Sequence, residues 1–244
     1  MATGVLVQVR LGSLRLPAKA LLLLPGGSII QHVMRALGGI PAEVRAIVTD
    51  SYSAPRLRPV AEQEGFDVVV GPAEDVLERF CVACRAHTLD RVIRATGDNP
   101  LVSARLGTEI LLLHQNAGAD LSHFLGNPWG TGVEVVQASA LYAAEREAMQ
   151  RDEREHITTF LYRHRERFNI LEPQAPVYGR MPEAQVTVDT REDYERVRRI
   201  FQELYAGDPI EVDRVIAWFG RGGSSAAAPS DDSLPDDGGG GPFG

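Results

Sequence analysis

Residues 4–19 read GVLVQVRLGSLRLPAK, an apolar run that turns abruptly into a loop carrying glycine, serine and three cations. The apolar part, residues 4–9, has the length and composition of a buried first strand. Strand-like and helix-like segments then alternate as far as residue 116. The expected strands are residues 4–9, 44–48, 66–70 and 91–95, and the expected helices are residues 28–37, 57–64, 74–87 and 105–116. This alternation predicts an α/β fold with a mainly parallel sheet and helices on both faces.

The second half of the sequence is less regular. It predicts a loop at residues 126–132, strands at 133–136 and 185–188, and helices at 138–151, 155–167, 191–204 and 209–219. Ser28 and Thr190 have the residue types of helix N-caps, and Asp193 would complete a capping box with Thr190. We expect one domain over residues 1–220, in which residues 127–168 form an arm that could pack against a second subunit.

The loop after the first strand has the composition of a phosphate-binding site. Gly12 lets the backbone approach a ligand closely, and Ser13 can donate from its amide and its hydroxyl. Arg10, Arg15 and Lys19 can neutralise a triphosphate. The Walker A pattern is absent, and a charged surface loop would not need this set of residues after a buried strand. Lys19 is also the only lysine among 25 basic residues, and tight phosphate sites often favour its compact charge.

Two aspartates follow expected strands. Asp98 lies in a Gly-Asn-Pro turn after residues 91–95, and Asp189 directly follows the segment 185–188. Ligands of parallel sheets bind beyond the carboxyl ends of the strands, so a carboxylate there is well placed to hold a divalent cation. The alternative is an aspartate that merely forms a turn. Among these acids Asp193 is the better candidate for a purely structural role.

The net charge bounds the class of protein. The 244 residues carry a formal charge of −8, of which residues 221–244 supply −3 from one Arg (+1) and four Asp (−4). The Gly, Ser and Pro content of that segment predicts a disordered acidic tail. An acidic body without a basic stripe argues against nucleic-acid binding. No apolar run reaches the roughly 18 residues of a membrane span, and no signal peptide is evident, so we expect a cytoplasmic protein that binds no membrane.

Two cysteines, Cys81 and Cys84, stand in a C-x-x-C spacing. Such a pair can be half of a zinc site or a redox pair, but a zinc site needs two further ligands and the sequence has no second pair. Because Val76, Leu77 and Phe80 recur with them at helical spacing, the main expectation is a buried helix face.

Residues 151–158 read RDEREHIT. On a helix, Asp152 and His156 are four residues apart and share a face. This pair could belong to a site, or the segment could be a solvated charged turn.

Taken together, the motifs resemble one family. In chain order they are R-x-G-S-x-R-x-P-x-K, E-D-V-L-E-R-F, T-G-D-N-P-L, P-x-G before V-E-V, R-E-H-I-T and V-D-T-x-x-D. From residue 5 to residue 219 the chain is similar to the SpsF-like cytidylyltransferases of spore coat polysaccharide synthesis, which are related to CMP-KDO synthetases. The resemblance implies a Rossmann-like nucleotide-diphospho-sugar transferase fold, CTP as substrate, Mg²⁺ as cofactor and release of pyrophosphate.

The resemblance also implies a role for each matching position. It assigns nucleotide binding to Val7, Gln8, Arg10, Gly12, Ser13, Arg15, Lys19, Arg79, Arg94, Thr96 and Asp98, with Lys19, Arg15 and Arg10 as the catalytic cations. It assigns the metal to Asp98 and Asp189, and the acceptor to Glu134, Arg154, Glu155 and His156. Ala18 departs from the glycine that the family usually has before the lysine, and its methyl group could restrict closure of the loop.

The expected function is therefore Mg²⁺-dependent transfer of CMP from CTP to a small anionic acceptor: a sugar acid, a polyol phosphate or a phosphonate. A phosphate or phosphonate needs no general base, whereas a hydroxyl does, and His156 is the first candidate. One alternative is a glycosyltransferase of the same fold, although the Asp-x-Asp motif usual in such enzymes is absent from the body of the sequence. The other is a non-catalytic nucleotide-binding subunit, against which the pair Asp98 and Asp189 speaks. We also expect a homodimer.

Overall fold

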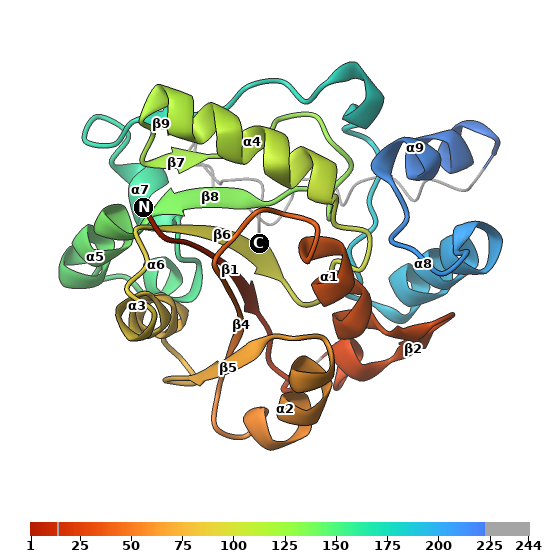
Figure 1. The fold of residues 1–244 in the computed structure, drawn as a ribbon, viewed down its shortest axis with the longest axis horizontal. Coiled ribbons are helices and arrows are strands. Elements are labelled where there is room, and N and C mark those ends of the chain that lie inside the picture. The colour runs from red at the N-terminus through yellow and green to blue at the C-terminus, as the bar shows by residue number, and fades with distance from the viewer. Residues whose placement is uncertain (14, 223–244) are drawn as a thin grey trace.

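The computed structural model describes residues 1–13 and 15–222. Leu14 and residues 223–244, which hold nearly all of the expected disordered tail, lie outside the described residues. The described part contains a seven-stranded sheet with helices on both faces, which confirms the expected α/β fold (Figure 1). No helix of this part is long and apolar enough to cross a membrane.

The sheet has the strand order β5-β4-β1-β6-β8-β7-β9. Its parallel half consists of β5 (Asp67–Val70), β4 (Val44–Thr49), β1 (Thr3–Gln8) and β6 (Arg91–Thr96). The other half is mostly antiparallel and consists of β8 (Glu134–Gln137), β7 (Leu121–Ser122) and β9 (Ile170–Leu171). A separate ribbon pairs β2 (Leu23–Leu24) with β3 (Gly27–Ser28). Because β1 and β6 are parallel neighbours, the loops that follow them leave the same edge of the sheet side by side.

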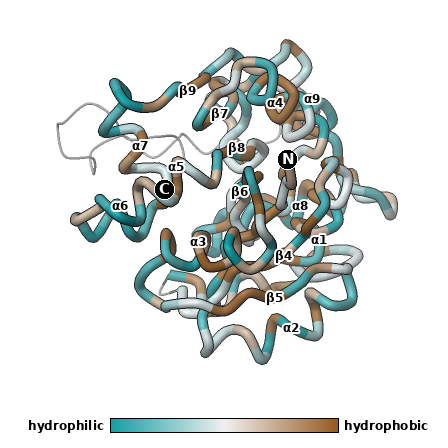
Figure 2. Tube along the Cα trace, turned by 60° about the vertical axis from the view of Figure 1, so that its left-hand side comes forward, coloured by the Kyte–Doolittle hydropathy of each residue, from teal (hydrophilic) through white to brown (hydrophobic). Residues whose placement is uncertain are grey.

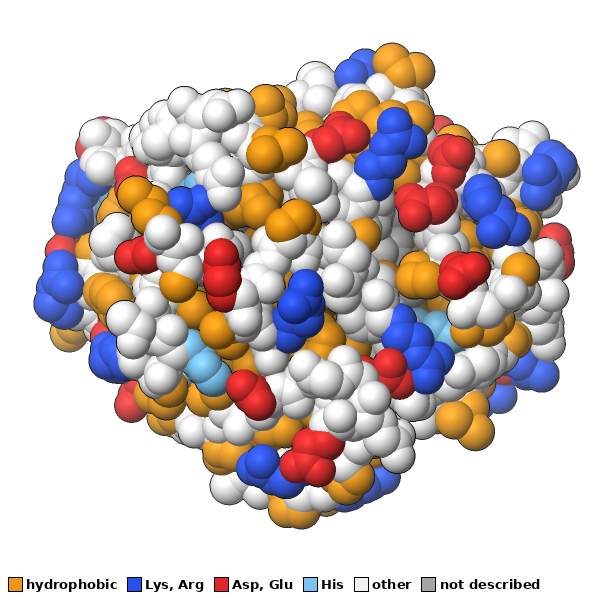
Figure 3. Space-filling model, viewed as in Figure 1, with side chains coloured by type: hydrophobic (Ala, Val, Ile, Leu, Met, Phe, Trp, Pro, Cys, Tyr) orange, Lys and Arg blue, Asp and Glu red, His pale blue; other side chains and the backbone are white. Residues whose placement is uncertain are grey.

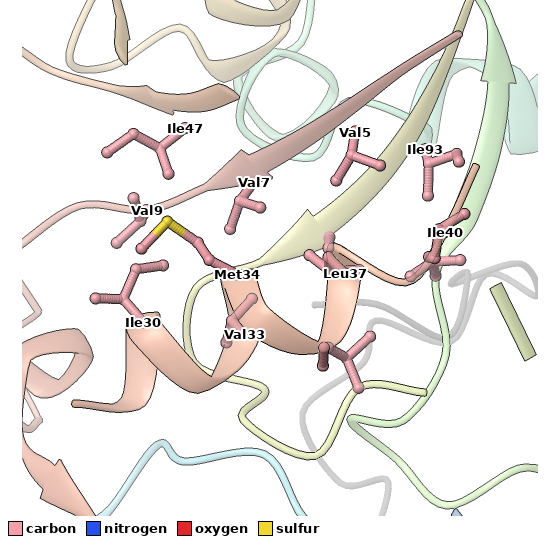
Figure 4. Packing of buried hydrophobic residues seen from close by; sticks show 14 of the residues in the cluster. Val5, Val7, Val9, Ile30, Val33, Met34, Leu37, Ile40, Ile47 and Ile93 are labelled. Atoms are coloured by element: carbon pink, nitrogen blue, oxygen red, sulfur yellow. The ribbon is translucent and has the colours of Figure 1, made fainter. Parts of the chain in front are cut away.

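The side chains of β1 alternate between two core clusters. Val5 and Val7 pack with α1 (Ile29–Leu37), α2 (Ala54–Gln63) and α4 (Ala104–Ala117), and Figure 4 shows them above α1. Leu6 belongs to the cluster on the other face, with α3 (Val76–Ala86), α5 (Ala138–Glu147) and α7 (Thr159–Arg163). Burial on both faces explains why β1 reads as a continuous apolar run rather than an alternating one.

Two helices begin at caps that the sequence predicts. Ser28 forms a capping box with Gln31 at the start of α1. Thr190 forms another with Asp193 at the start of α8 (Arg191–Leu204). Each box satisfies backbone amides that have no partner within the helix.

A third core cluster positions Asp189. In it, α8 and α9 (Val212–Gly220) pack against Val186 and Val188. The amide of Val188 donates to the carbonyl oxygen of Asp98 over 3.0 Å. The segment before Asp189 is thereby fixed beside the loop that follows β6.

The predicted strand at residues 185–188 is wrong. This segment forms only an isolated bridge between Gln185 and Trp129 and is no member of the sheet. Conversely, β7 and β9 have no counterpart in the prediction, because a strand of two residues carries no readable periodicity. The other predicted helices and strands, apart from residues 155–167, are present with ends shifted by a few residues.

The predicted single helix at residues 155–167 is also wrong. A short helix, α6 (Arg151–Glu155), ends where His156 adopts an extended backbone, and α7 begins only at Thr159. Asp152 and His156 therefore do not share a helix face, and the carboxylate of Asp152 pairs with Arg163 instead. Figure 2 shows α6 as a hydrophilic segment away from the hydrophobic strands of the sheet.

The buried face of α3 holds both cysteines, as the sequence predicts. Cys81 and Cys84 are free thiols with no exposed surface. Burial raises the pKa of Cys84 to about 12 and raises that of Cys81 further. Neither thiol is therefore poised to react as a thiolate.

Candidate active site

The loop from Arg10 to Lys19 is anchored at both ends. The amide of Leu11 donates to the hydroxyl of Ser53 over 2.9 Å, and that hydroxyl donates to Asp50 over 3.0 Å. The amide of Ala18 closes the loop on itself by donating to the carbonyl of Leu11 over 3.1 Å. Sequence reasoning did not find Asp50 and Ser53, although an Asp and a Ser three residues apart after a buried strand are a recognisable turn signal.

Lys19 lies between the two aspartates that the sequence singles out. Its ammonium nitrogen is 2.6 Å from Oδ2 of Asp98 and 2.7 Å from Oδ1 of Asp189. The side chain is 13% exposed. Burial lowers the pKa of Lys19, but the two carboxylates outweigh it and the pKa is raised overall. Residues 170 positions apart thus form one compact charged cluster.

The other two cations of the loop are also paired with acids. Arg10 lies 3.4 Å from Glu155 of α6, and Arg15 lies 3.5 Å from Asp189. Both arginines are well exposed, so these pairs contribute little to stability. Both arginines can therefore exchange their present partners for the oxygens of a polyphosphate.

Gly12 has free space on its side-chain side. A Cβ built on Gly12 would meet no atom of the described residues within 4 Å. Its neighbour Ser13 uses its hydroxyl to accept from the amide of Leu16, at 3.4 Å. Packing within the chain therefore does not require glycine at position 12, whereas close approach of a ligand would.

Ala18 has a left-handed backbone, with φ 52° and ψ 30°, immediately before the short 3-10 helix Lys19–Leu21. This conformation favours glycine. The consequence of alanine here is backbone strain at the turn that presents Lys19.

Replacing Ala18 with glycine is expected to raise the free energy of unfolding by about 0.5 kcal/mol. Relief of the left-handed strain outweighs the extra freedom of glycine in the unfolded chain. Urea unfolding of Ala18→Gly measures the difference. Ala20→Gly is the matched control, because Ala20 is buried in the same turn and its φ is negative, so this variant should be destabilised. If both variants were destabilised, the proposed backbone strain at Ala18 would be contradicted.

Arg79 of α3 is a buried cation with incomplete hydrogen bonding. It is 1% exposed, and among the described residues its Nε and Nη1 have no hydrogen-bond partner. Burial lowers the pKa of its guanidinium, although the charge of Asp50 opposes this effect. Gly71 leaves room for the side chain, since a Cβ there would come within 2.6 Å of Cγ of Arg79. Unpaired buried donors are costly, and such groups cluster at functional sites.

Replacing Arg79 with methionine is expected to stabilise the ligand-free protein by about 1 kcal/mol, because it removes a poorly paired buried charge. The same change should raise the KM for a nucleotide substrate about tenfold or more if the guanidinium donates to that nucleotide. Thermal unfolding and steady-state kinetics measure the two effects. Arg196→Met is the control: Arg196 is also buried, at 5% exposure, but it donates to Asp193 and to the carbonyl of Gln185, so its loss should destabilise. A fall in both stability and activity of Arg79→Met would indicate a structural role only.

Glu134 lies inside the molecule rather than at a surface open to an acceptor. It is 1% exposed, and its carboxylate pairs with Arg94 at 3.1 Å across β6 and β8. The hydroxyls of Thr158 and Tyr162 donate to the same carboxylate. Burial and the Glu134 charge raise the pKa of Tyr162 well above its usual range, so it stays a donor. Arg94 also donates to the side chain of Gln8, at 3.4 Å.

The remaining site residues that the sequence predicts have contacts of their own. The side chain of Val7 is fully buried, so only its backbone could contact a nucleotide. The hydroxyl of Thr96 accepts from the side-chain amide of Asn99 over 2.8 Å. Arg154 pairs with Asp75 at 3.4 Å, before the start of α3. Glu155 and Arg154 thus tie α6 to the phosphate loop and to α3, and His156 follows them.

Asp98 and Asp189 fit a divalent cation whose other ligands are water and the phosphates of a bound substrate. Two carboxylate oxygens, from Asp98 and Asp189, converge on the single nitrogen of Lys19. Within residues 1–13 and 15–222, no three acidic, histidine or cysteine side chains converge as a complete metal cage. Mg²⁺ is usually bound by one or two carboxylates together with water and substrate phosphates, which is the arrangement that this pair allows.

Residues 4–210 match the family model for cytidylyltransferases. The chain belongs to the cytidylyltransferase family. This cytidylyltransferase is 30% identical over 225 residues to the spore coat polysaccharide biosynthesis protein SpsF of Bacillus subtilis. The aligned region covers 88% of this chain and 93% of SpsF. The resemblance that the motifs predict is thereby confirmed, and the chain is a nucleotidyltransferase.

Solved structures share the fold of this cytidylyltransferase. A cytidylyltransferase from Leptospira borgpetersenii superposes with a TM-score of 0.83 at 23% identity, covering 91% of this chain and 95% of the other. A CMP:2-keto-3-deoxy-manno-octonic acid synthetase complexed with CTP superposes with a TM-score of 0.66 at 17% identity, covering 83% and 99%. These likenesses confirm the Rossmann-like nucleotidyltransferase fold.

Proposed function

We propose that this cytidylyltransferase transfers CMP from CTP to a small anionic acceptor and releases pyrophosphate. The observation that carries the proposal is the position of Lys19, on a cationic loop and between two converging carboxylates. The family supports nucleotidyl transfer, and the synthetase with the same fold that is complexed with CTP supports the choice of nucleotide.

The reaction joins two anions, so its main requirement is charge neutralisation. An acceptor oxygen attacks the α-phosphorus in line, the new O–P bond forms, and the bond to the β-phosphate oxygen breaks as pyrophosphate leaves. Lys19, Arg10 and Arg15 neutralise the triphosphate and the charge that develops on the leaving group. Gly12 and Ser13 supply backbone amides close to the phosphates.

We propose Asp98 and Asp189 as the ligands of a Mg²⁺ ion that arrives with the nucleotide. When bound, the ion supplies charge neutralisation at the phosphates and orientation of the reacting groups. Both aspartates are partly exposed, so their oxygens are accessible from solvent once Lys19 moves. Gln8, Thr96, Arg79 and Arg94 are proposed to contact the nucleotide or to support the residues that do.

We propose that the acceptor binds on the side of α6. Arg154, Glu155 and His156 lie there, and Glu155 already contacts Arg10 of the phosphate loop. If the acceptor oxygen is a hydroxyl, His156 takes its proton; a phosphate or phosphonate needs no base. Glu134 does not contact the acceptor in this proposal. Its carboxylate accepts from Thr158 and Tyr162 and so positions the segment that follows His156.

We further propose a cytoplasmic homodimer that binds no nucleic acid. On the face in Figure 3, acidic and basic side chains are interspersed rather than gathered into a basic patch. Much of the segment 127–168 packs into its own chain, since Ile157, Phe160 and Leu161 are buried. Trp129 and Met149 are the large apolar residues that this segment leaves exposed. Light scattering of the wild type and of Met149→Glu tests the dimer.

A pyrophosphate-release screen tests the function. All four nucleoside triphosphates are offered with sugar acids, polyol phosphates and phosphonates as acceptors. We expect release with CTP and at least one acceptor, and little release with ATP, GTP or UTP. Transfer of a sugar from a nucleotide-sugar, without pyrophosphate release from any triphosphate, would instead identify a glycosyltransferase and overturn the proposal.

A further inference from the structure

Lys19 lies at the place where a metal ion held by Asp98 and Asp189 would lie. Its nitrogen is within 2.7 Å of both carboxylates, so no second cation can sit between the same two oxygens. The cluster of Lys19, Asp98 and Asp189 is only partly exposed. Removing the ammonium without replacing it would leave two like charges close together, offset only by Arg15 at 3.5 Å from Asp189.

The chemistry of this position also distinguishes lysine from arginine. All 24 other basic residues of the chain are arginine. An ammonium is a compact point charge on a flexible stem, whereas a guanidinium is a planar fork. The compact ammonium lies, as a small cation does, at the point where two carboxylate oxygens converge, and its flexible stem allows it to move away.

We propose that Lys19 is an exchangeable counter-ion that excludes divalent metal from Asp98 and Asp189 until a nucleotide binds. The phosphates of the nucleotide then take over the ammonium, and the freed carboxylates receive the metal that accompanies them. That the nucleotide is CTP rests on the proposed function. Its consequence is positive coupling: nucleotide and metal each strengthen the binding of the other, and by linkage the two effects are equal.

Mn²⁺ binding to the ligand-free protein tests the exchange without any turnover. Free Mn²⁺ is followed by electron paramagnetic resonance in titrations of the wild type and of Lys19→Met. We expect the variant to bind Mn²⁺ at least about tenfold more tightly, because the two partly buried carboxylates have lost the cation that they share and only the exposed Arg15, 3.5 Å from Asp189, remains beside them. Equal affinities, or tight binding by the wild type, would overturn the proposal.

Two further variants show whether the effect is specific to this site. Arg10→Met removes the same charge from the same loop, but Arg10 contacts Glu155 and not the aspartates, so Mn²⁺ affinity should stay within about twofold of the wild type. Adding Asp98→Asn to Lys19→Met should abolish the gain. A gain of equal size in Arg10→Met would reduce the effect to general electrostatics and overturn the exchange.

The single lysine allows a second measurement on the unaltered protein, which does not depend on the folding of a variant. Labelling lysine with ¹⁵N at Nζ gives one side-chain resonance, that of Lys19. We expect this resonance to be unchanged by millimolar Mg²⁺ alone and to shift when CTP is added with Mg²⁺. A shift of equal size with Mg²⁺ alone would contradict the exchange. Pyrophosphate release alongside equal Mn²⁺ affinities would overturn the exchange only, whereas the expected Mn²⁺ pattern without pyrophosphate release would overturn the function only.

Discussion

Lys19→Met should lower kcat for pyrophosphate release by about a hundredfold to a thousandfold, the cost of losing one preorganised charge at a developing anion. Lys19 is the least exposed cation of the loop and the one nearest both proposed metal ligands. A residue that acts mainly in the transition state lowers kcat and kcat/KM together. Steady-state kinetics with CTP measure both constants, and circular dichroism confirms that the variant is folded.

Lys19→Arg separates charge from shape in this prediction. Arginine keeps the positive charge but not the compact ammonium, so we expect it to restore only a small part of the lost turnover. Turnover of Lys19→Met within a factor of about two of the wild type would contradict the role of Lys19 in the proposed mechanism.

Glu134→Ala should lower the free energy of unfolding by about 3–5 kcal/mol, because it leaves the guanidinium of Arg94 buried without its carboxylate partner. Both side chains are almost fully buried, with exposures of 4% for Arg94 and 1% for Glu134. Thr158 and Tyr162 would lose their acceptor at the same time. Urea unfolding measures the change.

The double variant Arg94→Met with Glu134→Leu is the matched comparison. Replacing both members of a buried ion pair with apolar side chains costs much less than removing one of them. We therefore expect the double variant to be more stable than Glu134→Ala. A Glu134→Ala protein as stable as the wild type would contradict the role of this buried pair in the stability of the fold.

The positions of Lys19 and Asp98 could be predicted from the sequence, because each residue follows a strand that the sequence identifies. A buried apolar run marks β1, the run before Thr96 marks β6, and residues that follow parallel neighbouring strands meet at one edge of the sheet. Asp189 reaches the same edge although its predicted strand is wrong. The hydrogen bond from Val188 to Asp98 and the packing of α8 and α9 put it there.

Other features depend on tertiary contacts that periodicity does not encode. The burial of Glu134 follows from the antiparallel pairing of β8 with β6, and four residues of strand do not reveal their direction. Arg79 has the helical spacing of α3, and only the tertiary structure shows that its side chain is almost fully buried. The pairing of Arg10 with Glu155 joins residues 145 positions apart, which no local motif predicts.

The central claim is nucleotidyl transfer at the Lys19 cluster, and the fate of the phosphorus atoms of CTP tests it most directly. Parallel reactions contain CTP labelled at the α-phosphorus or at the γ-phosphorus, Mg²⁺, and the acceptor that releases most pyrophosphate in the screen. The account predicts that the α label moves to the acceptor as a CMP conjugate while the γ label leaves as pyrophosphate. Release of the γ label as inorganic phosphate, with the α label left in CDP, would contradict it.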